Sequence, residues 1–175
     1  MVRHRALIAA LCAVVALAAA FAIAPAAAQD CVEGGDPATA IKACSALIGR
    51  EPNNAEAYFN RAWAYSERKN HQAAIRDYTK AIEIDPKGAR YYAARGAVHA
   101  GANANPRRDT DRALADLAKA IELDPDNARA HDTRCQVYVA RRDKAQATAA
   151  CQKALSLDPF NAVAKRFLNS VGVKQ

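Results

Sequence analysis

The chain shows a repeating pattern of apolar and polar positions between residues 55 and 161. Within each repeat, apolar residues recur at helical spacing in two segments that are separated by a short polar stretch. Prolines end the repeats at spacings of 34, 39 and 34 residues, at positions Pro52, Pro86, Pro125 and Pro159. A residue before proline avoids the helical region, so each proline marks the end of a helix. The pattern therefore predicts three repeats of two antiparallel helices, at 55–88, 89–127 and 128–161.

The segments on either side of the three repeats continue the pattern in part. Asp36 and Pro37 have the residue types of a helix start, and the helix that they begin ends before Pro52. Residues 29–52 are therefore predicted to form an N-terminal segment followed by the second half of a repeat. Residues 162–175 predict a capping helix with a tail, because terminal repeats need a polar outer face. The whole pattern predicts about eight helices.

Within each repeat, residue size follows a fixed order. Counted from the first residue of a repeat as place 1, large residues recur at places 4, 11 and 24, small residues at places 8, 20 and 27, and proline at place 32. In the first repeat these residues are Tyr58, Ala62, Tyr65, Ala74, Tyr78, Ala81 and Pro86. The arrangement resembles the tetratricopeptide repeat family, and the chain is similar to small exported bacterial members of it. The resemblance implies an all-α, right-handed superhelix of antiparallel helix pairs with a concave binding surface.

The resemblance also implies which residues contact a partner, because places 2, 5, 9 and 12 of the first helices line the concave face in this family. The partner-binding residues expected here are Glu56, Phe59, Trp63, Arg90, Ala93, Ala97, Arg129, Asp132 and Gln136. We expect Phe59 and Trp63 to be exposed apolar anchors, unless the N-terminal segment covers Trp63. Arg90 and Arg129 could bind a carboxylate, so the protein or peptide partner is expected to be acidic.

Some members of the family bind the acidic C-terminus of chaperones through a clamp of Lys, Asn and Arg side chains. This chain has Phe59 and Trp63 at the places of the first Lys and Asn of that clamp, and Thr133 at the place of its Arg. The clamp is therefore incomplete, and a chaperone tail is not the expected partner.

The middle repeat carries five additional residues near its centre. We expect residues 101–108 to form an extended loop there, which either reflects tolerated variation in loop length or contacts a partner. Asn70, Asp109 and Asp143 stand where the second helix of each repeat is expected to begin, and they have the side chains of N-caps.

Residues 1–28 have the features of a signal peptide that is removed on export. A basic start is followed by an apolar run from Leu7 to Ile23 and by the small residues 26–28. We expect the mature chain to begin at Gln29, in the periplasm or outside the cell, without stable membrane insertion. An uncleaved membrane anchor is the alternative, although the run is short for a membrane span.

Four of the five cysteines lie outside this segment, and export predicts that they form disulfide bonds. Cys135 and Cys151 stand at places 8 and 24 of the third repeat, which face each other in an antiparallel helix pair. Cys44 is at place 24 of the half repeat, and we expect it to pair with Cys31. A zinc or copper site that adds His131 is the alternative, but no fourth ligand is evident. Redox catalysis is a further alternative, but the sequence has no Cys-x-x-Cys motif.

The charge distribution and the absence of catalytic motifs argue against nucleic-acid binding and catalysis. The formal net charge is +7, but the basic residues are interspersed with acidic ones and form no stripe with aromatic residues, so a nucleic-acid partner is not expected. The sequence has no phosphate-binding loop or catalytic motif, so we expect no enzymatic activity, cofactor or metal. We expect a non-catalytic scaffold for protein or peptide binding in the cell envelope. The alternatives are an accessory subunit in envelope assembly or in thiol or metal-protein maturation, and self-association through the ends of the superhelix.

Overall fold

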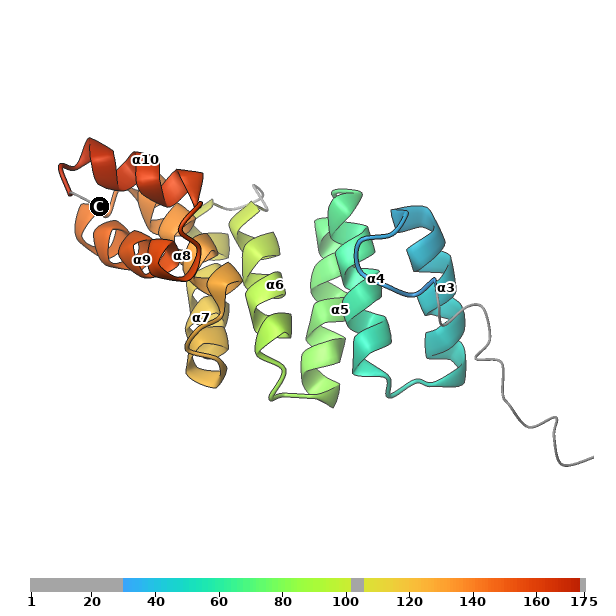
Figure 1. The fold of residues 1–175 in the computed structure, drawn as a ribbon. Helices are drawn as coiled ribbons and strands as arrows, with labels where there is room; N and C mark the ends of the chain where they lie inside the picture. The colour runs from blue at the N-terminus through green and yellow to red at the C-terminus, as the bar shows by residue number, and fades with distance from the viewer. Residues whose placement is uncertain (1–29, 102–105, 174–175) are drawn as a thin grey trace, which may run out of the picture.

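The computed structural model describes residues 30–101 and 106–173, so the predicted signal peptide lies outside the described residues. The described part of the chain contains eight helices and no strand, which confirms the predicted all-α architecture. The helices are α3 (Pro37–Arg50), α4 (Ala55–Glu67), α5 (His71–Ile84), α6 (Ala89–Gly101), α7 (Pro106–Leu123), α8 (Ala128–Arg141), α9 (Lys144–Leu157) and α10 (Ala162–Ser170). Figure 1 shows them side by side in chain order, with consecutive helices antiparallel.

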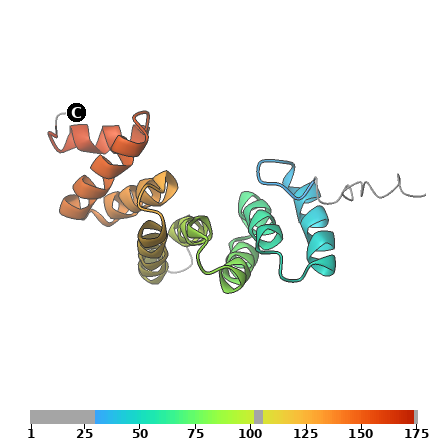
Figure 2. The same cartoon turned by 60° about the horizontal axis from the view of Figure 1, so that its bottom comes forward.

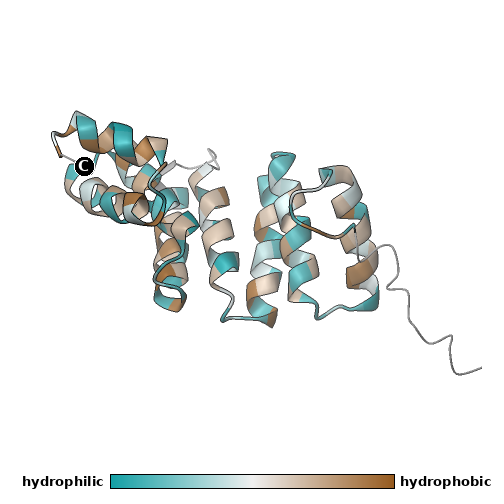
Figure 3. Ribbon diagram, in the orientation of Figure 1, coloured by the Kyte–Doolittle hydropathy of each residue, from teal (hydrophilic) through white to brown (hydrophobic). Residues whose placement is uncertain are grey.

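The helices form an elongated array and not a closed bundle. Figure 2 shows that the row from α3 to α10 turns along its length, with the first helix of each repeat packed against the first helix of the next. Apolar and polar residues are interspersed along every helix, as Figure 3 shows, because each helix packs on its neighbours and also meets solvent. No helix in the described part of the chain is long and apolar enough to span a membrane.

Side-chain caps fix where most of the helices begin. Helices α4, α5, α8, α9 and α10 are each preceded by an Asn or Asp whose side chain accepts a hydrogen bond from the backbone N–H three residues later. These bonds satisfy backbone donors that have no partner inside the helix. Asn70 and Asp143 are confirmed as N-caps.

The expected start of α7 is wrong. This helix begins at Pro106, so Asp109 lies within its first turn and is not its N-cap. Proline suits the first turn of a helix, where its missing N–H has no partner to lose. Because α6 also includes Gly101, residues 101 and 106–108 are helical and do not belong to an extended loop. The longer α7, with 18 residues against 14 in α5 and α9, takes up most of the five additional residues.

The two helices of each repeat are in close contact at places 8 and 24. In the first repeat, Ala62 meets Tyr78 within one buried cluster. In the second repeat, a Cβ atom added to Gly96 would lie 3.1 Å from Leu117 Cγ, so the site leaves little room for a side chain. In the third repeat, the same two places are joined by the Cys135–Cys151 disulfide bond.

A buried ion pair also links the two helices in the first and second repeats. Arg61 donates to both carboxylate oxygens of Asp77, at 2.6 and 2.9 Å. Arg95 makes the same two bonds to Asp116, at 2.8 and 2.7 Å. Arginine is at place 7 and aspartate at place 23 in both repeats. Each arginine also donates to a hydroxyl at place 25 of the preceding unit, from Ser45 and Thr79 respectively.

The third repeat keeps the arginine but lacks both acceptors. Arg134 is at place 7, whereas place 23 is Ala150 and place 25 of the preceding repeat is Ala118. The Nε atom of Arg134 is buried without a hydrogen-bond partner in the described part of the chain, and one Nη atom lies 3.4 Å from His131 Nδ1. The disulfide bond is therefore the strong link between α8 and α9.

The second disulfide bond closes the N-terminal end of the array. Cys31 is bonded to Cys44 of α3, and the Cα atoms are 4.8 Å apart. The side chain of Asn60 in α4 donates to the Cys31 carbonyl oxygen at 2.9 Å. These two contacts hold the N-terminal segment against α3 and α4, and Figure 1 shows it folding back before α3 begins. The structure thus contains both disulfide bonds expected from the sequence.

The difference between the first and third repeats can be tested with one substitution in each. Arg61→Met should lower the free energy of unfolding by roughly 3 kcal/mol, because it leaves the buried Asp77 carboxylate without its partner. Arg134→Met should change it by less than about 1 kcal/mol, because no carboxylate depends on Arg134. Denaturant unfolding at neutral pH measures both values, and equal losses would contradict the role given to the ion pair.

Candidate partner-binding face

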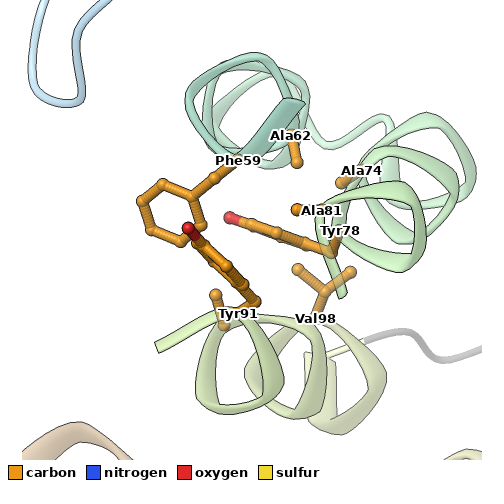
Figure 4. Packing of buried hydrophobic residues seen from close by; sticks show 8 residues of the cluster. Phe59, Ala62, Ala74, Tyr78, Ala81, Tyr91 and Val98 are labelled. Carbon is orange, nitrogen blue, oxygen red and sulfur yellow. The ribbon is translucent and has the colours of Figure 1, made fainter. Parts of the chain in front are cut away.

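Place 5 does not belong to the open face, which corrects the expectation for two residues. Phe59 is only 2% exposed, and Ala93 is fully buried. Figure 4 shows the Phe59 ring lying against Tyr78 and Tyr91, with ring centroids 5.6 and 5.4 Å away. The expectation that Phe59 is an exposed anchor is therefore wrong, because the next repeat covers it.

The side chain at place 5 contacts the next unit in every repeat. Phe59 meets Tyr91 at the start of α6, and Ala93 packs in one cluster with Ala130 at the start of α8. In the third repeat, Asp132 accepts a hydrogen bond at 2.6 Å from the side chain of Asn161, the N-cap of α10. Place 5 thus joins each first helix to the helix that begins the next unit.

The residues that remain accessible stand mainly at places 2 and 9. Glu56, Arg90 and Arg129 at place 2 are exposed, as is Gln136 at place 9. Trp63 and Ala97, also at place 9, are partly buried. The open face is therefore a row of charged and amide side chains, without the pair of exposed aromatic anchors that was expected.

Arg90 is held in a fixed position on this row. Its guanidinium group forms an ion pair with Glu56 of the preceding repeat and lies 4.7 Å from the centre of the Phe59 ring. The Tyr91 hydroxyl donates to the same Glu56 carboxylate at 2.7 Å. The ring stacking is a cation–π contact, which orients the guanidinium plane. One face of Arg90 still meets solvent, since its side chain is 51% exposed.

Arg129 contacts a segment that is distant in sequence. Its Nη1 atom lies 3.6 Å from a carboxylate oxygen of Glu33, in the N-terminal segment held by Cys31. Both side chains are about half exposed. The contact joins the start of α8 to the opposite end of the array, so it spans the row of place 2 residues.

Tyr78 is the buried group whose ionisation is most altered. Its side chain lies in the core between α4, α5 and α6, and its hydroxyl has no hydrogen bond of ordinary geometry within the described residues. Burial raises the pKa of Tyr78 to about 12, and the nearby Arg129 charge and Ser66 hydroxyl offset only part of that rise.

His99 and His131 are the two buried histidines of the described residues. Burial lowers the pKa of both His99 and His131. One ring nitrogen of His131 lies 2.9 Å from the carbonyl oxygen of Pro125. Within the described residues, no group of three or more His, Cys, Asp or Glu side chains is arranged to hold a metal ion.

Sequence reasoning missed two residues that contact this face, Glu33 and Tyr91. Glu33 stands before two glycines in a segment without repeat signals, so nothing in the pattern placed it beside Arg129. Tyr91 stands at place 3, which is alanine in the other repeats, at Ala57 and Ala130. That irregularity was a usable signal, because a large residue at a small place must displace or cover a neighbour.

The antiparallel helix pairs, their periodic contacts and their open face define a helical-repeat scaffold. The sequence pattern of the tetratricopeptide repeat matches residues 55–87 and again residues 107–162. The chain belongs to the tetratricopeptide repeat family.

Known proteins with similar sequence or structure agree with this family. The chain is 37% identical over 59 residues to Hsp70-Hsp90 organizing protein 3 of Arabidopsis thaliana, a match that covers 34% of this chain but only 11% of that protein. A thermophilic TPR protein of Thermus thermophilus has a similar structure, with a TM-score of 0.68 and 18% identity over 78% of this chain and 75% of that one. The first TPR of Spaghetti (RPAP3), solved bound to the HSP90 peptide SRMEEVD, has a TM-score of 0.60 and 20% identity over 67% and 89% of the two chains.

The altered ionisation of Tyr78 predicts a loss of stability at alkaline pH. The ordinary pKa of a tyrosine hydroxyl is 10.0. Between pH 10 and about 12, Tyr78 is therefore ionised in the unfolded chain but neutral in the folded chain. The stabilising contribution is therefore complete below pH 10 and is lost as the pH rises, by about 3 kcal/mol in all.

Tyr78→Phe should remove this part of the alkaline loss and leave stability at pH 7 nearly unchanged. Tyr91→Phe is the matched substitution, and it should cost about 1–2 kcal/mol at pH 7 because it removes the hydrogen bond to Glu56. Thermal unfolding of the three proteins at pH 7, 10 and 11.5 measures the difference. The same alkaline loss in wild type and Tyr78→Phe would show that burial of this hydroxyl is not the cause.

Proposed function

We propose that the protein is a non-catalytic scaffold that binds an acidic segment of a partner protein or peptide along the row of place 2 residues. The observation that carries this proposal is that Arg90 and Arg129 are exposed and that each pairs with a carboxylate. Both guanidinium groups are about half exposed, at 51% and 47%, and both already hold a carboxylate of the chain itself. Their position therefore suits a carboxylate ligand.

The chemistry of arginine supports an acidic partner. A guanidinium group offers several donors in one plane, which matches the two oxygens of a carboxylate. Arg90 is oriented by the Phe59 ring, so little conformational freedom is lost when it binds. Gln136 lies further along α8, donates to Asp132 at 2.8 Å and is itself exposed, so it supplies a polar contact beside Arg129.

The structural relatives support the class of partner and not its identity. One similar domain was solved with an HSP90 peptide that contains acidic residues, which is consistent with peptide binding by this fold. In this chain, however, Phe59 is buried and Thr133 replaces an arginine of the chaperone-tail clamp. We therefore propose a different acidic segment as the partner.

We further propose that the protein acts in the cell envelope after export. The signal-like residues 1–28 and the two disulfide bonds support this location, because disulfides persist in oxidising compartments. A role in thiol or metal-protein maturation is not favoured by a specific observation, since all four cysteines outside the signal-like segment are bonded in pairs.

Partner binding should depend on the two arginines of the place 2 row. Arg90→Gln combined with Arg129→Gln should lower the recovery of partners in a crosslinking pull-down from envelope extract by about tenfold at low salt, since each lost charge contact contributes roughly 0.7 kcal/mol. Arg76→Gln combined with Arg166→Gln removes the same charge from exposed positions on α5 and α10. This control should recover partners as wild type does, and an equal loss in both variants would mean that net charge alone is responsible.

Export should leave a defined N-terminus. Sequencing of the mature protein from the envelope fraction should begin at or near Gln29, because small residues at 26–28 precede it. Recovery of the full-length chain in the membrane fraction would identify the segment as an anchor.

A further inference from the structure

The N-terminal segment between Cys31 and Asp36 is a short loop that is fixed at both ends. At one end, Cys31 is bonded to Cys44 and its carbonyl oxygen accepts from Asn60. At the other end, Asp36 caps α3 by accepting a hydrogen bond from the backbone N–H of Thr39 at 2.8 Å. Between them the chain turns at Gly34, which has a φ of +93° that side chains rarely adopt. Glu33 stands at this turn.

The position of Glu33 places its carboxylate beside Arg129, on the row proposed to bind a partner. Within the described residues, the Glu33 side chain makes one direct polar contact, which is the ion pair with Arg129. Exposed ion pairs of this kind contribute little to stability, and salt weakens them further. The loop therefore presents a carboxylate to the row without a strong bond to keep it there.

The acceptor of the other arginine is bound more firmly. Glu56 is on α4 itself, pairs with Arg90, and also accepts from the Tyr91 hydroxyl. Glu56 is held beside Arg90 by the hydrogen bond from Tyr91, whereas Glu33 is held beside Arg129 by the ion pair alone. The two carboxylates thus differ in how readily an incoming group can replace them.

We infer that Glu33 is an internal ligand of the partner-binding row, which an acidic partner segment displaces from Arg129 when it binds. This inference rests on the proposed function, because it assigns a competitor to the same site. Val32, beside Glu33, is exposed. A partner that imitates the loop would therefore carry a carboxylate next to a branched apolar residue.

The weakness of the Glu33–Arg129 ion pair determines how much Glu33 lowers the affinity for a partner. An internal ligand lowers the apparent affinity of a competing ligand by the fraction of molecules in which the site is free. For an exposed ion pair, removing the competitor should tighten binding by about two- to fivefold. The gain should shrink at high salt, because the Debye length shortens.

The test uses the mature chain with both disulfide bonds formed, and a fluorescein-labelled peptide in which Glu alternates with Val and Ser. Glu33→Gln should bind this probe about two- to fivefold more tightly than wild type at low salt, by fluorescence anisotropy. Glu83→Gln is the matched control, because it removes the same charge from an exposed pair with Lys80 on α5. Its affinity should equal that of wild type.

Two further variants separate this inference from the proposed function. With Arg129→Gln in place, the additional change Glu33→Gln should no longer alter the affinity. If wild type binds the probe but Glu33→Gln binds it equally well, the inference is overturned and the binding row stands. If neither wild type nor Glu33→Gln binds the probe, the acidic partner class and the inference both fail. A gain in Glu83→Gln as large as that in Glu33→Gln would also overturn the inference, since it would reflect net charge.

Discussion

The close approach of the two helices at places 8 and 24 is the constraint on which the rest of the structure depends. Each repeat satisfies it with a small residue or with a covalent bond, and each adds one strong link beside it. In the first two repeats the link is the buried Arg–Asp pair, and in the third it is the Cys135–Cys151 bond. Place 23 is alanine wherever place 24 is cysteine, at Ala43 and Ala150, so the two kinds of link replace each other.

This constraint determines which side chains are free to bind a partner. Once the helices of a repeat are held together, place 5 of the first helix points toward the next repeat and is buried there, as Phe59 and Ala93 show. Place 2 lies at the start of the same helix and stays exposed, so it carries charged residues in all three repeats. Packing between repeats and exposed charge are thus assigned to separate places on one helix.

The sequence was sufficient for the features that repeat. The helix pairs, the caps at Asn70 and Asp143, and the facing positions of Cys135 and Cys151 all follow from spacing and local chemistry. It was insufficient where one repeat departs from the others. The burial of Phe59 depends on Tyr91 in the next repeat, and the position of Glu33 depends on a loop with no periodic signal. The start of α7 at Pro106 depends on how the longer helix takes up the additional residues.

The charged contacts of the molecule fall into two groups with different consequences. The Arg–Asp pairs inside the first two repeats are largely buried and have two hydrogen bonds each, so breaking one leaves an isolated charge in the core. The pairs at place 2 are exposed, so a competing carboxylate can replace one of their partners at small cost in free energy. A scaffold needs contacts of both kinds, because the surface that binds a partner must exchange ligands while the helices beneath it keep their spacing. The Cys31–Cys44 bond connects the core with the exposed row. It is a buried covalent link, and it holds the loop that carries the exchangeable Glu33.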